Sequence, residues 1–277
     1  YFVPILLYII VGGSLVITNR NVELKISTKE AFLITVLSWL LLGILCAVPF
    51  IYTKTDLTVV DAFFESMSGI TTTGATVLNN LDELPKGILI WRALLQWLGG
   101  IGIVVIALVI LPFLRIGGMQ LFHLEGDDPY DKFLPKISSV VKKIIIVYAS
   151  LTAILFILYY LNHMTLFDAL AHSFTTISTG GFSTHDNSFA YFQNTSLQNI
   201  AIIFMIFGSF PFLLLAQMSL TNISSLIRDN QIRLFLSILV LAIVSIYYFA
   251  QSYVDGNTLQ KLSTISFNTI SIISIFN

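Results

Sequence analysis

The sequence predicts an all-α membrane protein made of concatenated helix–pore-loop–helix repeats, incomplete after the third pore helix. Apolar residues make up 56% of the chain and charged residues only 10%, against roughly a quarter charged in soluble proteins. Several apolar runs are long enough to cross a bilayer, and two polar stretches between them repeat one design at a fixed spacing. The net charge of −1 gives no electrostatic basis for binding nucleic acid.

The membrane-crossing segments follow from length and hydropathy. A spanning helix needs about 20 mostly apolar residues. Pro112 and Pro211 mark places where such a helix can kink or end. The predicted spans, two of them slightly short, are Tyr1–Ile17, Ala31–Tyr52, Ile88–Leu114, Ile144–Leu161, Leu197–Leu220 and Leu234–Phe249.

The connections between these spans differ in charge. Ten of the 14 lysines and arginines lie in Asn19–Lys29, Arg115–Lys143 and Asn222–Arg233. The basic connections alternate strictly with connections that carry few basic residues. Because basic loops stay in the cytoplasm, this pattern predicts a multi-pass protein of the plasma (inner) membrane with Tyr1 and the polar repeated stretches outside.

The first of these stretches lies in the connection after the second span. Thr58–Gly69 is apolar but too short to span, which is typical of a re-entrant helix. We expect Asp61 to cap this helix. The segment Asp61–Thr76 aligns without gaps with Asp168–Ser183, at an offset of 107 residues. Such internal repetition predicts a repeat architecture.

The repetition divides the chain into five parts. The third copy joins Leu234–Phe249 to Leu262–Ser274 and stops where the next glycine is expected. Its filter and second helix are not in the sequence, so we expect a piece of a longer protein or a truncated chain. The predicted parts are a preceding transmembrane helix and cytoplasmic loop (1–28), the first repeat (29–114), a cytoplasmic loop (115–143), the second repeat (144–221) and a partial third repeat (222–277).

The Thr/Gly-rich ends of the aligned stretches predict a cation filter. Threonine and glycine are poor helix formers, and non-helical backbone at membrane depth must be covered by protein or line a watery cavity. Extended backbone can turn its carbonyls inward to replace the water around a dehydrated cation. Oxygen ligands suit hard cations, and the carbonyl end of the preceding short helix favours positive charge. The predicted filter segments are Thr71, Thr72, Thr73 and Gly74, and Ser178, Thr179, Gly180 and Gly181.

The chain resembles the Trk/Ktr/HKT superfamily of potassium transporters, most of all its TrkH type. Three stretches carry the resemblance: FFESMSGITTTGATV (63–77), WRALLQWLGGIGIVVIALVILPFLRIGGMQLF (91–122) and AHSFTTISTGGFSTHD (171–186). It implies four concatenated repeats, K⁺ uptake, a homodimer and a cytosolic nucleotide-binding regulatory subunit of the TrkA kind. No cofactor is expected besides the transported ion. The resemblance implies K⁺ ligands at Thr72, Thr73, Gly74, Thr179, Gly180 and Gly181.

The glycines at 74 and 181 match the family's key position, where a larger residue weakens the preference for K⁺ over Na⁺. In other respects the chain departs from the pattern. It lacks the third filter, the fourth repeat, the intramembrane gating loop and the basic residue of the last repeat. A truncated, non-conducting assembly subunit is therefore an alternative to potassium uptake.

Two other function classes fit the sequence less well. An intramembrane enzyme is a remote alternative, because no nucleophile elbow is present. The only candidate residues for its active site would be Ser68, Gly69, His172 and His185. We therefore expect no enzyme. A transporter for another solute would favour inverted repeats, whereas these repeats run parallel.

Several other residues invite a functional reading. We expect a structural role for Glu65, and Arg92 is either functional or an interfacial charge that snorkels. The small residues of Gln96–Gly102 indicate close helix packing. Gly126–Asp131 lacks the spacing of a calcium loop. His185–Asp186 is expected to be a pair that stabilises its loop.

Overall fold

The structure, a computed structural model, describes residues 2–18, 28–53, 57–110, 129–217 and 228–275. Within these ranges the regular structure is helical. The elements are α1 (Phe2–Thr18), α2 (Thr28–Tyr52), α3 (Val59–Ile70), η1 (Leu81–Glu83), α4 (Lys86–Ile110), α5 (Pro129–Leu161), α6 (Leu166–Ile177), η4 (Ser188–Phe192), α7 (Thr195–Gly208), α8 (Phe212–Gln217), α10 (Asn230–Ala250) and α11 (Thr258–Ile275).

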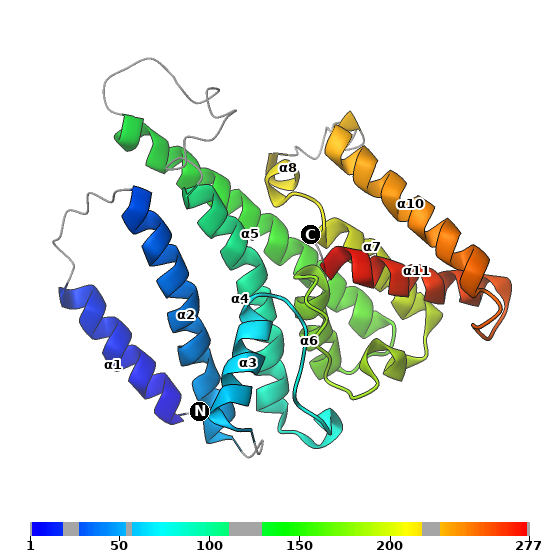
Figure 1. Ribbon diagram of the computed structural model, residues 1–277, viewed down its shortest axis with the longest axis horizontal. Coiled ribbons are helices and arrows are strands. Elements are labelled where there is room, and N and C mark those ends of the chain that lie inside the picture. Colours follow the sequence, from blue (N-terminus) through cyan, green and yellow to red (C-terminus); the bar gives the residue numbers. More distant parts are fainter. Residues whose placement is uncertain (1, 19–27, 54–56, 111–128, 218–227, 276–277) are drawn as a thin grey trace.

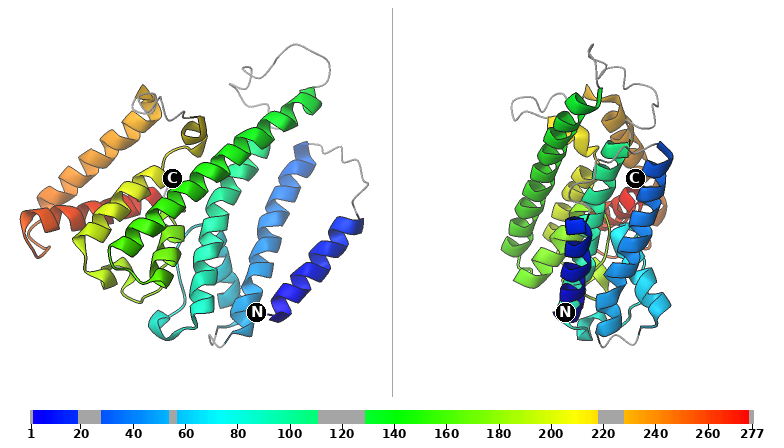
Figure 2. Two further views of the ribbon diagram at one scale, coloured as in Figure 1. Left: turned by 180° about the vertical axis from the view of Figure 1, so that it is seen from behind. Right: turned by 90° about the vertical axis from the view of Figure 1, so that its left-hand side faces the viewer.

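Long helices run side by side, with the short helices between them (Figure 1). The view from behind shows α4 and α5 in the middle, α1 and α2 on one flank, and α10 and α11 on the other (Figure 2). Four of the described helices, α2, α4, α5 and α10, are long and apolar enough to cross a membrane. Large apolar side chains on them face outward, such as Leu241 and Leu33. The prediction of a multi-pass helical membrane protein is confirmed.

The repeat predicted from the sequence appears in the helix packing. In the first repeat α3 packs between α2 and α4, and in the second α6 packs between α5 and α7. Each second helix also contacts the short helix of the next repeat, α4 with α6 and α7 with α11. The two filter segments are therefore held close to α4, the helix that joins the repeats.

Two glycines make these contacts close. A side chain at Gly99 in α4 would overlap the carbonyl group of Ile70, the last residue of α3. Gly208 in α7 has the same relation to Ile177, the last residue of α6, with a position for Cβ that lies 2.7 Å from the carbonyl oxygen. The expected role of Gln96–Gly102 in packing is thus seen in this contact of helix with backbone.

The second half of the predicted loop 115–143 is helical. Helix α5 already begins at Pro129 and is 33 residues long. Proline is favourable in the first turn of a helix. Polar residues follow it, so α5 extends beyond its apolar, membrane-spanning part. The predicted boundaries at 114 and 221 lie outside the described residues, as do most of the basic connections.

The predicted span Leu197–Leu220 is not one helix. Helix α7 ends at Gly208, and α8 begins at Phe212. Pro211 lacks a backbone N–H and its ring clashes with the preceding turn, so the helix breaks where the proline suggested a kink. The N–H of Ser209 closes the last turn of α7 by donating to Met205 and Ile206.

The start of α3 also differs from the prediction. The N-cap is Thr58, not Asp61. The Thr58 hydroxyl oxygen accepts the Asp61 N–H at 3.2 Å, while the Asp61 carboxylate accepts the Thr58 N–H. This is a capping box, in which the acid three residues inside the helix reaches back to the cap. Thr165 caps α6 in the same position.

Candidate functional site

The backbone after each short helix is irregular, as the sequence predicts. The residues that follow α3 and α6 form a turn and then run on without regular structure. Left-handed backbone recurs at equivalent places, with φ of 57° at Thr72 and 78° at Gly74, and 52° at Thr179 and 79° at Gly181. The two pairs are 107 residues apart, so both repeats use one unusual conformation. Threonine adopts it at a cost, whereas glycine adopts it freely.

In these segments most backbone N–H groups have hydrogen-bond partners, whereas most of the carbonyl groups do not. Backbone N–H groups turn back to the short helices: Thr73 donates to Ser68 and Gly180 donates to Thr175, both at 2.9 Å. Within the described part of the chain, no hydrogen bond reaches the carbonyl oxygens of Thr71, Thr72, Thr73, Gly74, Thr179 and Gly181. Carbonyls without a partner are the groups that a dehydrated cation needs.

The two segments touch each other. A Cβ on Gly74 would overlap the carbonyl oxygen of Gly180, so only glycine allows this approach. The Gly180 oxygen also accepts a hydrogen bond from the Gln96 side chain at 2.7 Å. Gly181 is different, because a Cβ there would meet nothing within 4 Å. The segments are thus brought together, and Gly180 is the predicted ligand whose carbonyl already has a partner.

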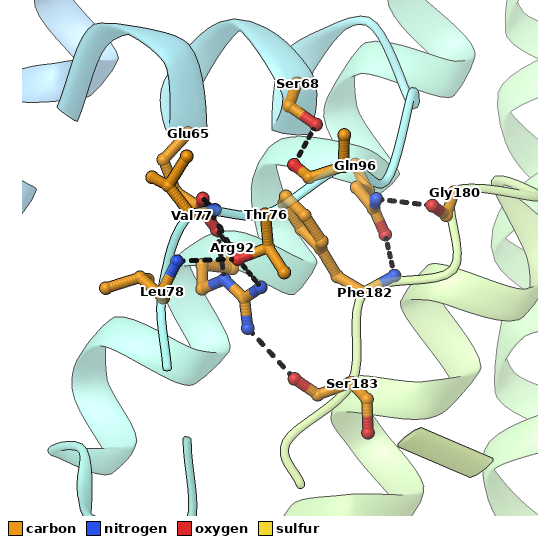
Figure 3. Close-up of polar contacts among 11 residues, drawn as sticks. Glu65, Ser68, Thr76, Val77, Leu78, Arg92, Gln96, Gly180, Phe182 and Ser183 are labelled. Carbon is orange, nitrogen blue, oxygen red and sulfur yellow. Dashed lines mark hydrogen bonds and ion pairs between the residues drawn. The ribbon is translucent and has the colours of Figure 1, made fainter. Parts of the chain in front are cut away.

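In the first repeat, a buried carboxylate holds the end of the filter segment (Figure 3). Glu65, from α3, is fully buried. It accepts the Thr76 hydroxyl at 2.9 Å and the Val77 N–H at 3.0 Å. The Thr76 oxygen in turn accepts the N–H of Leu78. We call this arrangement the filter buttress: an acceptor on the short helix, a hydroxyl after the filter, and the N–H two residues beyond.

The second repeat builds the same buttress with another acceptor. His172 aligns with Glu65, and Ser183 aligns with Thr76. Nδ1 of His172 faces the Asp168 carbonyl oxygen at 2.9 Å, which assigns the proton to Nδ1 and leaves Nε2 to accept the Ser183 hydroxyl at 3.1 Å. The Ser183 oxygen accepts the N–H of His185, again two residues on.

Arg92 and Gln96 of α4 connect the repeats, which the sequence did not reveal. Arg92 pairs with Glu65 at 2.7 Å, and both side chains are almost fully buried. The expected structural role of Glu65 fits this pairing, but Arg92 lies in protein and does not snorkel. The available signal was the presence of two opposite charges in apolar segments of one repeat, since buried charges are normally paired.

The loops that follow the two filter segments also meet. His185 and Asp186, the pair expected to stabilise its loop, both contact the first repeat. His185 Nδ1 hydrogen-bonds the Asp82 carboxylate, and the Asp186 carboxylate accepts the Leu81 N–H at 2.9 Å. The His185 ring stacks on Tyr191. The hydrogen bond from His185 holds the pKa of Asp82 below its ordinary value.

Comparison with known proteins decides the family. The TrkH family model, described as a cation transport protein, matches residues 2–259. The chain belongs to the TrkH family. TrkH proteins are transporters and not enzymes, so the intramembrane enzyme considered above is excluded.

Relatives agree with this assignment. The Trk system potassium uptake protein TrkH of Escherichia coli (strain K12) is 38% identical over 269 residues, 95% of this chain and 55% of that protein. TrkI of Halomonas elongata, also named a Trk system potassium uptake protein, is 35% identical over 259 residues, 93% of this chain and 52% of that protein. The crystal structure of the potassium transporter TrkH from Vibrio parahaemolyticus matches with a TM-score of 0.86 at 34% identity, covering 98% of this chain and 56% of that one. The chain spans about half the length of these TrkH-family relatives.

Proposed function

We propose that this chain contributes two of the repeats that surround a potassium-selective uptake pathway in the plasma membrane. The observation that carries the proposal is the pair of adjacent Thr/Gly segments with matching left-handed residues and unpartnered carbonyls. The names of the relatives, which are potassium uptake proteins, support the choice of K⁺. We infer ligands at Thr72, Thr73, Gly74, Thr179, Gly180 and Gly181.

The chemistry required of the pathway is modest. Carbonyl oxygens replace the water around K⁺, and the C-terminal ends of α3 and α6 add negative potential. The membrane potential then drives the cation inward with about 2.3 kcal/mol per charge per 100 mV. These steps need no cofactor within this chain.

Potassium rescue tests the proposal. We would express the chain in a bacterium without its own K⁺ uptake systems and measure growth on low-K⁺ medium and Rb⁺ uptake. Gly181→Ser is the informative variant, because its side chain has room but its left-handed φ of 79° strains the filter. Gly102→Ser is the matched control, because a Cβ there also meets nothing within 4 Å and its φ is not left-handed.

Rescue by the native chain and by Gly102→Ser, with loss in Gly181→Ser, supports the proposal. Equal rescue by both variants would contradict the filter assignment. If the native chain is inserted in the membrane but gives no uptake, the alternative of a non-conducting assembly subunit is favoured.

We further infer that the filter segments face the outside and the basic connections face the cytoplasm, as the charge bias suggests. The chain has a single cysteine, Cys46, which can be changed to serine. An impermeant maleimide added to intact cells should then label Asn79→Cys, beside η1, but not Gln231→Cys, at the start of α10. Both positions are exposed. The reverse labelling would overturn this topology.

We also propose two partners, a second copy of the chain and a cytosolic nucleotide-binding regulatory subunit of the TrkA kind. Family membership is the support for both. The mass of the purified protein in nanodiscs tests the homodimer, and co-purification with a co-expressed regulatory subunit tests the second partner. A monomeric mass, or no co-purification, would contradict the respective proposal.

A further inference from the structure

Two side chains of α4 lie between the filter segments of different repeats. Arg92 and Gln96 are one helical turn apart on one face of α4, with exposed fractions of 1% and 0%. Neither has an outlet to solvent or lipid. The Gln96 amide faces the backbone of the second filter segment, and the Arg92 guanidinium faces Glu65, the Thr76 hydroxyl and the Ser183 carbonyl (Figure 3).

Gln96 spans Gly181, one of the two left-handed residues of the second filter. Its Nε2 donates to the Gly180 carbonyl at 2.7 Å, and its Oε1 accepts the Phe182 N–H at 3.0 Å. The two bonded groups flank Gly181, whose φ is 79°. One amide thus fixes the backbone on both sides of Gly181, and it directs the Gly180 oxygen toward Gly74 of the first filter.

Arg92 links the two filter buttresses. Besides its ion pair with Glu65, its Nη2 donates to the Thr76 hydroxyl and its Nη1 donates to the Ser183 carbonyl, each at 3.0 Å. The guanidinium also lies 4.1 Å from the centre of the Phe182 ring. A single planar cation therefore contacts the first short helix, the end of the first filter and the end of the second.

Helix packing alone does not require these residues. The glycines that contact the short helices, Gly99 and Gly208, place the two second helices in register. Arg92 and Gln96 precede Gly99 by seven and three residues. At the same distances before Gly208, α7 has Ala201 and Met205. Both are buried apolar residues. Since α7 packs against its short helix without a buried charge, and burying one is costly, the polar pair in α4 must serve the filters.

We propose that Arg92 and Gln96 are positioning residues that set the preference for K⁺ over Na⁺. They fix the second filter relative to the first, and with it the spacing of the carbonyl ligands. This inference rests on the proposed function. Neither side chain needs to touch the ion, since both act through Gly180, Phe182 and Ser183.

The main variant is Gln96→Met, which keeps a long side chain of similar volume and removes both hydrogen bonds. Gln96→Glu retains an acceptor for the Phe182 N–H but lacks the donor for Gly180. Arg92→Lys keeps the charge near Glu65 but cannot donate hydrogen bonds to Thr76 and Ser183 at the same time. Trp97→Phe is the matched control, because its indole N–H donates to Thr152 and not to a filter segment.

Two readouts are needed. The first is the ratio of K⁺ to Na⁺ uptake by the full chain in the K⁺-uptake-deficient bacterium. The second is amide hydrogen exchange of the segment 178–183 in the purified chain, in K⁺ and in Na⁺. It does not depend on transport. We expect Gln96→Met to lower the ratio, and to speed exchange of the Phe182 amide, by about tenfold each, as for the loss of one well-formed buried hydrogen bond.

The outcomes separate this inference from the proposed function. The inference is supported if the segment 178–183 exchanges faster in Gln96→Met and exchanges equally in K⁺ and in Na⁺, while Trp97→Phe exchanges like the native chain. This holds even if the native chain does not transport, in which case only the proposed function fails. Native exchange in Gln96→Met, an unchanged uptake ratio in a transporting chain, or an equal effect of Trp97→Phe would overturn it. Arg92→Lys should lie between the native chain and Gln96→Met in both readouts.

Discussion

The contact between α4 and the end of α3 gives a quantitative prediction. In Gly99→Ala, the new Cβ would lie 2.6 Å from the carbonyl carbon of Ile70 and closer still to its oxygen, whereas in Gly208→Ala the nearest atom, the Ile177 carbonyl oxygen, is 2.7 Å away and the carbonyl carbon 3.5 Å away. Ordinary contact begins near 3.4 Å, so α4 and α3 must separate by at least about 0.8 Å in the first variant. Overpacking of this kind costs about 3 kcal/mol at the upper end, because the obstacle is backbone.

Alanine also favours a helix over glycine by about 1 kcal/mol. The net loss in Gly99→Ala is therefore about 2 kcal/mol. Gly208→Ala, whose Cβ would lie 2.7 Å from the Ile177 carbonyl oxygen, should be destabilised less than Gly99→Ala, and Gly102→Ala, which meets nothing within 4 Å, is neutral to slightly stabilising. Thermal unfolding of the purified chain measures the series, with an expected drop of about 4–8 °C for Gly99→Ala. If Gly99→Ala and Gly102→Ala unfold at the same temperature, the close approach of α4 to α3 is not present and the reasoning fails.

Three further predictions concern the supports of the filter. Glu65→Ala should destabilise the chain by about 3–5 kcal/mol in an unfolding titration, because it leaves Arg92 buried without its carboxylate; a loss under 1 kcal/mol would mean that the pair is solvated. Thr58→Ala, which removes the cap of α3, should cost about 1 kcal/mol, and an unchanged midpoint would contradict the capping box. The lowered pKa of Asp82, caused by its bond to His185, predicts a stabilisation present above the ordinary carboxylate pKa and lost as pH falls through the lower folded value. Melting curves from pH 7 to pH 3 should show a smaller acid loss in Asp82→Asn than in the native chain, and equal losses would show that the bond does not form.

How far the sequence predicts the structure depends on the range of the interaction. The two short helices, the irregular backbone after each and the offset between them are set by local propensity and by repetition, so they could be predicted. The cap of α3 was assigned to the wrong residue because Asp61 and Thr58 fit the same local pattern and only the dihedral angles decide. Pro211 predicts a kink or an end of the helix, but the sequence does not show that two separate helices result.

The supports of the filter could not be predicted in the same way. The partners of Arg92 and Gln96 lie up to 91 residues away in the chain, and no local pattern specifies which backbone carbonyl a buried side chain will reach. A comparison of the two repeats offers the better signal. Wherever aligned buried positions differ in charge, as Glu65 and His172 do, the difference must be compensated by a neighbour that differs as well.

That compensation explains the asymmetry between the repeats. The first buttress uses a carboxylate as acceptor, and its negative charge requires a buried cation, which α4 supplies at Arg92. The second uses Nε2 of His172, and the bond from Nδ1 to the Asp168 carbonyl already completes that ring without a charge. A cation on α7 would then be buried without a partner, and Ala201 stands where it would be. The guanidinium is thus needed once, and because it stands on the helix between the two filters, the cation that neutralises the first buttress is also free to hold the end of the second.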